Sequence, residues 1–164
     1  MAILMEKEIS IDRTIAVNND VSRALARPTR GKIVELLNKK QLNVEQIRSR
    51  LKKHGYKKSV TTIRHHIEIL KDSGLIEITK IEESQGAITK YYGSSTKLLD
   101  FSLPPDFDEN YSKVISKTSL KLEKIIGPIL KNFSKTRKIQ QINYNNYIVM
   151  EIMNRSLTNL LEKK

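Results

Sequence analysis

The segment Val60–Ser73 carries side chains that can recognise the edges of nucleic-acid bases: Thr61, Thr62, Arg64, His65 and Glu68. Arginine forms paired hydrogen bonds with guanine, threonine contacts the thymine methyl group, and histidine bonds to a base edge or a phosphate. At about 100° per residue, a helix here places its apolar side chains on one side and these polar ones over the opposite half, with Thr62 at the flank. The apolar side consists of Val60, Ile63, Ile67 and Leu70.

Basic residues are concentrated around this segment. Between Arg48 and Lys71, eight side chains are basic and only Glu68 is acidic, so the stretch holds seven of the twelve net positive charges of the chain. Ser59 is the expected N-cap of the helix, and free backbone amides at a helix N-terminus favour phosphate. We therefore expect phosphate contacts from residues beside that end: Lys52, Lys53, Lys57, Lys58 and Ser59.

The composition of the 164 residues agrees with an anionic partner. The net charge of +12 favours nucleic acid first and an anionic membrane second. Apolar residues make up 38% and aromatic residues 5%, which supports a modest aliphatic core. The N-terminus lacks the pattern of a secretory signal, and no run approaches about 18 apolar residues, so we expect a soluble cytoplasmic protein without a membrane partner.

Residue patterns typical of enzymes and metal sites are missing from the sequence. It contains no cysteine, no glycine-rich phosphate loop and no Ser/His/Asp grouping. The three histidines, His54, His65 and His66, all lie in the first half of the chain. We therefore predict no enzyme activity, no catalytic residue, no metal and no cofactor.

The elements around the basic segment follow a recognisable order. A short helix ends at Arg27-Pro28, because a residue before proline leaves helical geometry. Gly74 is suited to end the helix that starts at Ser59. Four helices are expected: over Asn18–Ala26, from an N-cap at Thr29 to near Asn38, from Asn43 or Val44 to Leu51, and over Val60–Ser73. Two strands follow, Leu75–Ile81 and Ala87–Tyr92, around a Glu82–Gly86 loop. This mainly α order with a small β-hairpin is that of a winged helix-turn-helix.

Two long amphipathic helices are predicted after the hairpin. Pro104-Pro105 interrupts the chain, and apolar residues then recur at helical spacing to Phe133 and again from about Lys138 to Leu161. We predict an N-terminal extension (1–16), a winged-helix domain (17–96), a linker (97–107) and a helical region (108–164). The apolar stripes of these helices can fold back on the domain or pair with a second subunit, and we expect a homodimer through the C-terminal helices.

Two stretches resemble ArsR-type transcription regulators. Ala24–Leu37 is similar to their leucine–alanine–x–proline–threonine–arginine opening, and Thr62–Ile76 is similar to their recognition helix through His66-Ile67, Leu70 and Gly74-Leu75-Ile76. The Tyr91-Tyr92-Gly93 ending and the long tail resemble archaeal versions. This resemblance covers about half the chain and implies a winged-helix fold that binds DNA.

Three features depart from that family. The Lys52–Lys58 turn is longer than usual, so the next helix can be presented at a different angle. Glu82 and Glu83 at the expected wing tip would be repelled by phosphate, so wing contacts are expected from the stem, at Lys80 and Lys90. Metal-sensing members use cysteines, or His and Asp on C-terminal helices, which argues against metal sensing here.

The sequence thus favours a sequence-specific regulator that reads the major groove of double-stranded DNA with the 60–73 helix. Two alternatives stay open: a winged-helix adaptor for protein interactions, and an RNA-binding protein or component of the transcription machinery. Little salt-sensitive affinity for random duplex DNA would favour the adaptor. Competition between duplex DNA and structured RNA would test the RNA-binding alternative.

Overall fold

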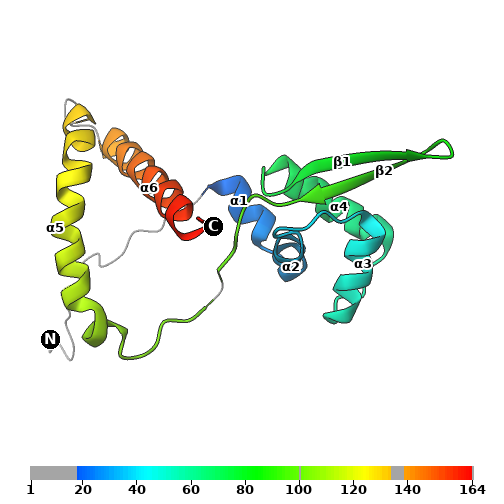
Figure 1. Cartoon of the computed structure of the whole chain (residues 1–164), viewed down its shortest axis with the longest axis horizontal. Coiled ribbons are helices and arrows are strands. Elements are labelled where there is room, and N and C mark those ends of the chain that lie inside the picture. Colours follow the sequence, from blue (N-terminus) through cyan, green and yellow to red (C-terminus); the bar gives the residue numbers. More distant parts are fainter. Residues whose placement is uncertain (1–17, 100, 134–138, 164) are drawn as a thin grey trace, which may run out of the picture. The chain divides into compact units, whose positions relative to one another are not determined.

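A computed structural model describes residues 18–99, 101–133 and 139–163 of the chain (Figure 1). The chain forms two compact units, Val17–Phe101 and a second that includes Ser102–Lys164. The extension expected over residues 1–16 lies outside the described residues. Among the described residues, every helix falls short of the length and apolar character that a membrane crossing requires.

The first unit contains four helices followed by an antiparallel hairpin. Figure 1 shows the hairpin extending past the helices of this unit. The order confirms the predicted winged helix-turn-helix. The elements are α1 (Asn19–Leu25), α2 (Pro28–Leu36), α3 (Val44–Lys53), α4 (Val60–Asp72), β1 (Glu77–Ser84) and β2 (Ala87–Gly93).

Local hydrogen bonds set the ends of α3 and α4. Asn43 and Gln46 form a reciprocal capping box, with N···O distances of 2.9 and 3.0 Å. At the end of α4, Gly74 has a φ of +75°, and the Leu75 amide donates to the Leu70 carbonyl at 3.0 Å. Gly74 therefore takes the left-handed conformation that closes a Schellman motif.

The predicted start of α2 at a Thr29 cap is wrong. The helix begins at Pro28, and Arg27 is the N-cap without a side-chain cap bond. Proline suits the first helical position because its missing N–H would have no intrahelical acceptor there. Thr29 is buried inside the first turn instead.

The core of the first unit combines side chains from every helix, the strand β2 and two connecting segments. The apolar stripe predicted over Val60–Leu70 is buried apart from half-buried Val60. The segment between α2 and α3 also pairs with β2, since Leu42 and Tyr92 exchange backbone hydrogen bonds of 3.0 and 2.9 Å. The buried core is Ala24, Ile33, Val34, Leu37, Leu42, Ile47, Leu51, Ile63, Ile67, Leu70, Leu75, Ile76 and Tyr92.

The loop expected over Glu82–Gly86 is shorter than predicted. β1 continues to Ser84, and the turn consists of Gln85 and Gly86, whose φ values are +50° and +76°. A two-residue turn with positive φ at both positions matches the twist of the flanking strands. Glu82 and Glu83 consequently lie within the strand ladder, opposite Thr89 and Ile88.

The second unit contains α5 (Phe107–Phe133) and α6 (Ile139–Leu161), which contact each other. Both helices were expected from the sequence. α5 buries none of its side chains, and the one buried side chain described in α6 is polar Asn145. Apolar residues such as Val114, Ile125 and Leu157 are 55%, 63% and 49% exposed.

Candidate nucleic-acid interface

α4 presents two different faces. Ile63, Ile67 and Leu70 are buried on one side, and the expected reading residues occupy the other. On that polar side, Thr62 is half-buried and four side chains are exposed: Thr61, Arg64, His65 and Glu68. The helix therefore packs by its apolar side and leaves charged and hydrogen-bonding groups in solvent.

Thr62 and Ser59 are engaged with each other at the start of α4. The Ser59 hydroxyl accepts from the Thr62 amide at 3.1 Å, and the two side-chain oxygens are 2.9 Å apart. These groups satisfy the helix N-terminus. Thr61, which is exposed and has no such bond among the described residues, is the more available of the two threonines.

An open groove of about 770 Å³ lies between α4, the start of α3 and β2. It brings together Arg64 and Glu68 from α4 with Lys90 from the hairpin. Glu68 accepts a 2.6 Å hydrogen bond from Lys71, and this bond raises the pKa of Lys71. The groove thus combines hydrogen-bond donors and a carboxylate acceptor next to the exposed face of α4.

The start of α3 also lines this groove, through Asn43 and Glu45, and Ile88 adds an apolar side chain from β2. Sequence reasoning placed Asn43 only at the start of an amphipathic segment and did not consider Glu45 or Ile88 as part of this surface. The approach of α3 to the hairpin depends on the Leu42–Tyr92 backbone pairing, which has no sequence pattern.

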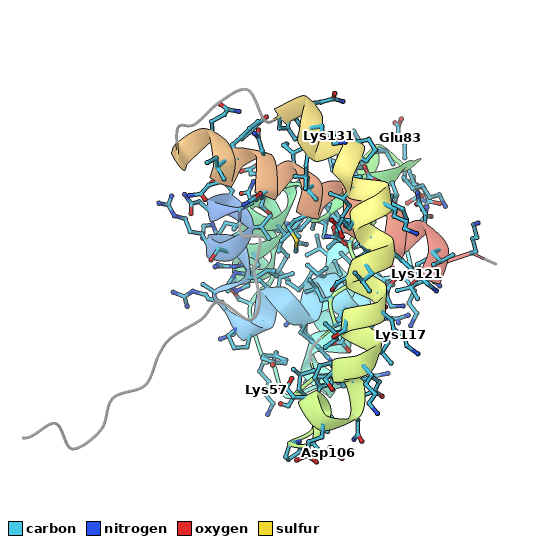
Figure 2. All side chains as sticks on the ribbon, turned by 90° about the vertical axis from the view of Figure 1, so that its left-hand side faces the viewer. Lys57, Glu83, Asp106, Lys117, Lys121 and Lys131 are labelled. Atoms are coloured by element: carbon cyan, nitrogen blue, oxygen red, sulfur yellow. The ribbon has the colours of Figure 1, made fainter. Side chains whose placement is uncertain are left out.

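The predicted phosphate-binding lysines do not form one cluster. Lys57 and Lys58 are exposed immediately before α4, where Figure 2 labels Lys57. Lys52 and Lys53 are exposed at the end of α3 but project about 100° apart around it. Lys53 lines a separate groove of about 510 Å³ with Lys40, Arg50 and His54.

The two hairpin lysines have different surroundings. The Lys80 ammonium pairs with Glu82 and lies 5.2 Å from the centre of the Tyr91 ring. The hydrogen bond from Lys80 lowers the pKa of the Glu82 carboxyl, and the same bond raises the pKa of Lys80. Lys90 instead lies opposite Ile81 and lines the α4 groove. Lys90 is therefore the hairpin cation nearer to the reading face.

His66 is buried in α4 and is 6% exposed. Its Nδ1 atom has no hydrogen-bond partner, and burial, followed by the charges of Arg30 and His65, lowers the pKa of the imidazole. Within the described ranges, no group of three or more His, Asp or Glu side chains is arranged to hold a metal ion. These surroundings keep His66 neutral inside the helical core.

Arg30 supports the fold beneath this surface. It is 7% exposed, and its guanidinium donates to the carbonyls of Ala24 and of Arg23, the latter at 2.8 Å. These carbonyls lie at the C-terminal end of α1, where helical N–H donors run out. The Ala26 amide also donates to the Arg23 carbonyl, at 3.3 Å. The sequence motif contains this arginine, but its role as a buried cap is visible only in the fold.

A comparison with protein families agrees with the helix-turn-helix. A family model described as a helix-turn-helix domain matches residues 25–79. No curated protein sequence matches the chain. Among solved structures, the chain is similar to the homodimeric winged helix-turn-helix DNA-binding domain of Mb0332 from Mycobacterium bovis, described as a possible ArsR-family transcriptional regulator. The two sequences are 23% identical, the match covers 64% of this chain and 81% of that chain, and the TM-score is 0.36.

It is also similar to Bacillus subtilis PadR in complex with operator DNA, with 15% identity over 82% of this chain and 93% of that chain and a TM-score of 0.39. The family model and the observed element order together identify a helix-turn-helix domain within the first unit, with a β-hairpin wing.

Proposed function

We propose that this chain is a sequence-specific regulator of transcription that binds double-stranded DNA and reads the major groove with α4. The observation that carries the proposal is the division of α4 into a buried apolar side and an exposed side with arginine, histidine, threonine and glutamate. The major groove is about 12 Å wide and admits a helix. The match to a helix-turn-helix family model supports this role, in which the protein binds without catalysis.

The reading residues have distinct proposed roles. Arg64 bonds to guanine, Glu68 accepts from the cytosine amino group, and Thr61 contacts a thymine methyl group. His65 bonds to a base edge or a phosphate. Thr62 stays at the flank, because its hydroxyl is engaged with Ser59.

Phosphate contacts position α4 in the groove. Lys57, Lys58 and the N-terminal amides of α4 bind one stretch of backbone. Lys90, on the hairpin, binds a second stretch of the DNA backbone. Lys52, at the end of α3, binds another stretch beside that helix. Lys53 and Lys80 lie at the edge of the proposed interface, because Lys53 lines another groove and Lys80 pairs with Glu82.

Selection of bound sequences from a random duplex pool, followed by titration of variants, tests this assignment. Arg64→Ala is expected to weaken binding to the selected site by about 1–3 kcal/mol and to relax the base preference at one position. Lys57→Gln with Lys58→Gln should weaken binding to all duplexes and reduce the salt slope by about 2.

Arg155→Gln is the matched control, because it removes one positive charge from α6, outside the proposed interface. Its binding to the selected site should equal that of the wild type. Unchanged affinity of Arg64→Ala for the selected site would contradict the assignment of α4 as the reading helix.

The exposed apolar side chains of α5 and α6 support a second part of the proposal, a homodimer through these helices. Val114, Ile125 and Leu157 are examples of side chains that a second copy would remove from water. A two-fold dimer calls for a roughly palindromic site with half-sites about one helical turn apart. Sedimentation equilibrium tests it, and a monomer at all concentrations would contradict it.

Resemblance at Ala24–Leu37 and Thr62–Ile76 supports an ArsR-type assignment within the winged-helix regulators. Because the chain has no cysteine, the proposal includes no thiolate metal sensor.

A further inference from the structure

One side of α5 carries a row of lysines outside the proposed reading surface: Lys113, Lys117, Lys121, Lys124 and Lys131. At about 100° per residue, their spacing places all five within an arc of about 80°. At about 1.5 Å of rise per residue, this α5 lysine row is about 27 Å long. Figure 2 shows Lys117 and Lys121 projecting from the same side of the helix.

The α5 lysine row lies apart from most apolar side chains of the helix and from its acidic ones. Most apolar residues of α5 fall in a different arc of about 120°. Its acidic residues, Asp108, Glu109 and Glu123, also lie outside the lysine arc. The first four lysines of the row are exposed. The helix therefore presents a strip of one charge sign to solvent.

Several cations on other helices form local ion pairs: Lys32 with Glu35 at 2.8 Å, Lys71 with Glu68 at 2.6 Å, and Arg155 with Glu151 at 2.8 Å. In the part of the chain that the structure describes, the first four lysines of the row have no such acidic partner. Their charge is not neutralised locally, which leaves it available to an external polyanion.

We propose that the α5 lysine row binds the phosphate backbone of duplex DNA, as a contact additional to the α4 surface. This inference rests on the proposed function, because it takes duplex DNA to be the partner of the chain. Duplex DNA carries one phosphate charge per about 1.7 Å of axis, so a row of this length lies within reach of several phosphates. Contacts of this kind add affinity without sequence preference.

The charge distribution around α5 favours a duplex over an anionic membrane. A membrane that received the apolar arc would meet both of its flanks. One flank carries the lysines, but the other carries Asp108 and Glu123, which anionic lipid repels. A duplex can contact the lysine flank alone.

Replacement of four lysines together tests the proposal: Lys113→Gln, Lys117→Gln, Lys121→Gln and Lys124→Gln. Glutamine keeps helix propensity and removes charge. Titration of the full chain with a labelled random-sequence duplex at several salt concentrations should show a salt slope shallower by about 3–4, and affinity about tenfold lower or more near 0.1 M salt. The double variant Lys117→Gln/Lys121→Gln should show about half that change in slope.

The matched control places arginine at the same four positions, which keeps the charge and should keep the wild-type salt slope. Circular dichroism should give equal helix content for all these variants. An unchanged slope in the fourfold glutamine variant would overturn the inference. Loss of binding to phosphatidylserine-containing vesicles with unchanged duplex binding would also overturn it.

Parallel titration of the Lys57→Gln/Lys58→Gln variant distinguishes the two proposals. If this variant loses affinity for random duplex and the fourfold variant does not, the α4 interface stands and the lysine row is not a DNA contact. If only the fourfold variant loses affinity, the row stands and the phosphate contacts assigned beside α4 do not.

Discussion

The two units of the chain differ in how completely they bury their apolar side chains. In Val17–Phe101, thirteen apolar residues are shielded from solvent and form one core. In the second unit, α5 has no buried side chain, and the buried position of α6 described in the structure is an asparagine. The first unit can hold a rigid surface by its own packing, whereas the second has apolar surface that association would cover.

Equivalent truncations in the two units should have very different effects. Leu70 is 0% exposed and Ile125 is 63% exposed. Leu70→Ala is expected to lower the free energy of unfolding by about 2–5 kcal/mol, because it leaves a cavity in a closed core. Ile125→Ala should change the stability of the monomer by less than about 0.5 kcal/mol. Urea unfolding at low protein concentration measures both.

Protein concentration sharpens this comparison. If α5 lies in a dimer interface, the Ile125→Ala variant should dissociate at a higher protein concentration than the wild type. Leu70→Ala should unfold at a lower urea concentration than the wild type, whatever the protein concentration. Ile125→Ala could instead cause a large loss of stability that does not depend on protein concentration. That result would show that Ile125 belongs to a closed core within one chain.

Arginines in the two units provide the second comparison. Arg30 is buried and bonds to two carbonyls at the end of α1, whereas the Arg155 side chain is 79% exposed in its pair with Glu151. Arg30→Ala should cost about 1.5–3 kcal/mol, because it removes the side-chain donor of the buried Ala24 carbonyl and one of the donors of the Arg23 carbonyl. Arg155→Ala should cost about 0.3–0.5 kcal/mol. Thermal unfolding checks the order, and equal losses would contradict the capping role of Arg30.

Helix periodicity was enough to predict the buried side of the first unit, because a helix that packs on one core repeats its apolar residues every three or four positions. Ile63, Ile67 and Leu70 are buried accordingly. Capping chemistry also placed the start of α4, since the Ser59 hydroxyl accepts a hydrogen bond from the Thr62 amide in the first turn of that helix. These features depend on neighbours in sequence.

Features that depend on distant neighbours were not predictable in the same way. The groove beside α4 requires the start of α3 to approach β2, and a single Leu42–Tyr92 pairing leaves no periodic pattern. The hairpin turn was placed too early because Glu82 and Glu83 are polar, although polar residues also occupy exposed strand positions. Similarly, the sequence identified Lys80 as a phosphate-binding cation but did not reveal its ion pair with Glu82.

Glycines test the backbone of the two units. Gly74 has a φ of +75° at the end of α4, whereas Gly127 lies inside α5, with no atom within 4 Å of an added Cβ. Gly74→Ala should lower the free energy of unfolding by about 1 kcal/mol, because a Cβ disfavours the left-handed region. Gly127→Ala should raise it by about 0.5–1 kcal/mol. Opposite signs in chemical denaturation are expected, and a stabilising Gly74→Ala would contradict the Schellman ending.

Mild acid should act on the first unit, because all three histidines of the chain lie there. Burial, Arg30 and His65 lower the pKa of His66 from its ordinary value of 6.5, with smaller contributions from Arg27 and Lys58. Below pH 6.5 the unfolded chain therefore binds a proton that the folded protein still excludes. The free energy of unfolding should decrease as the pH falls from 6.5 toward the lower pKa of the folded state.

His66→Gln should reduce this pH dependence, whereas His65→Gln, at the exposed neighbouring position, should largely retain it. Urea unfolding at a series of pH values measures the slopes, and circular dichroism of the helices at each pH confirms that the native states are alike. If the free energy of unfolding depends equally on pH in the wild type and in His66→Gln, another group controls the acid sensitivity of the first unit. The acid effect would then have to come from the other two histidines or from carboxylates.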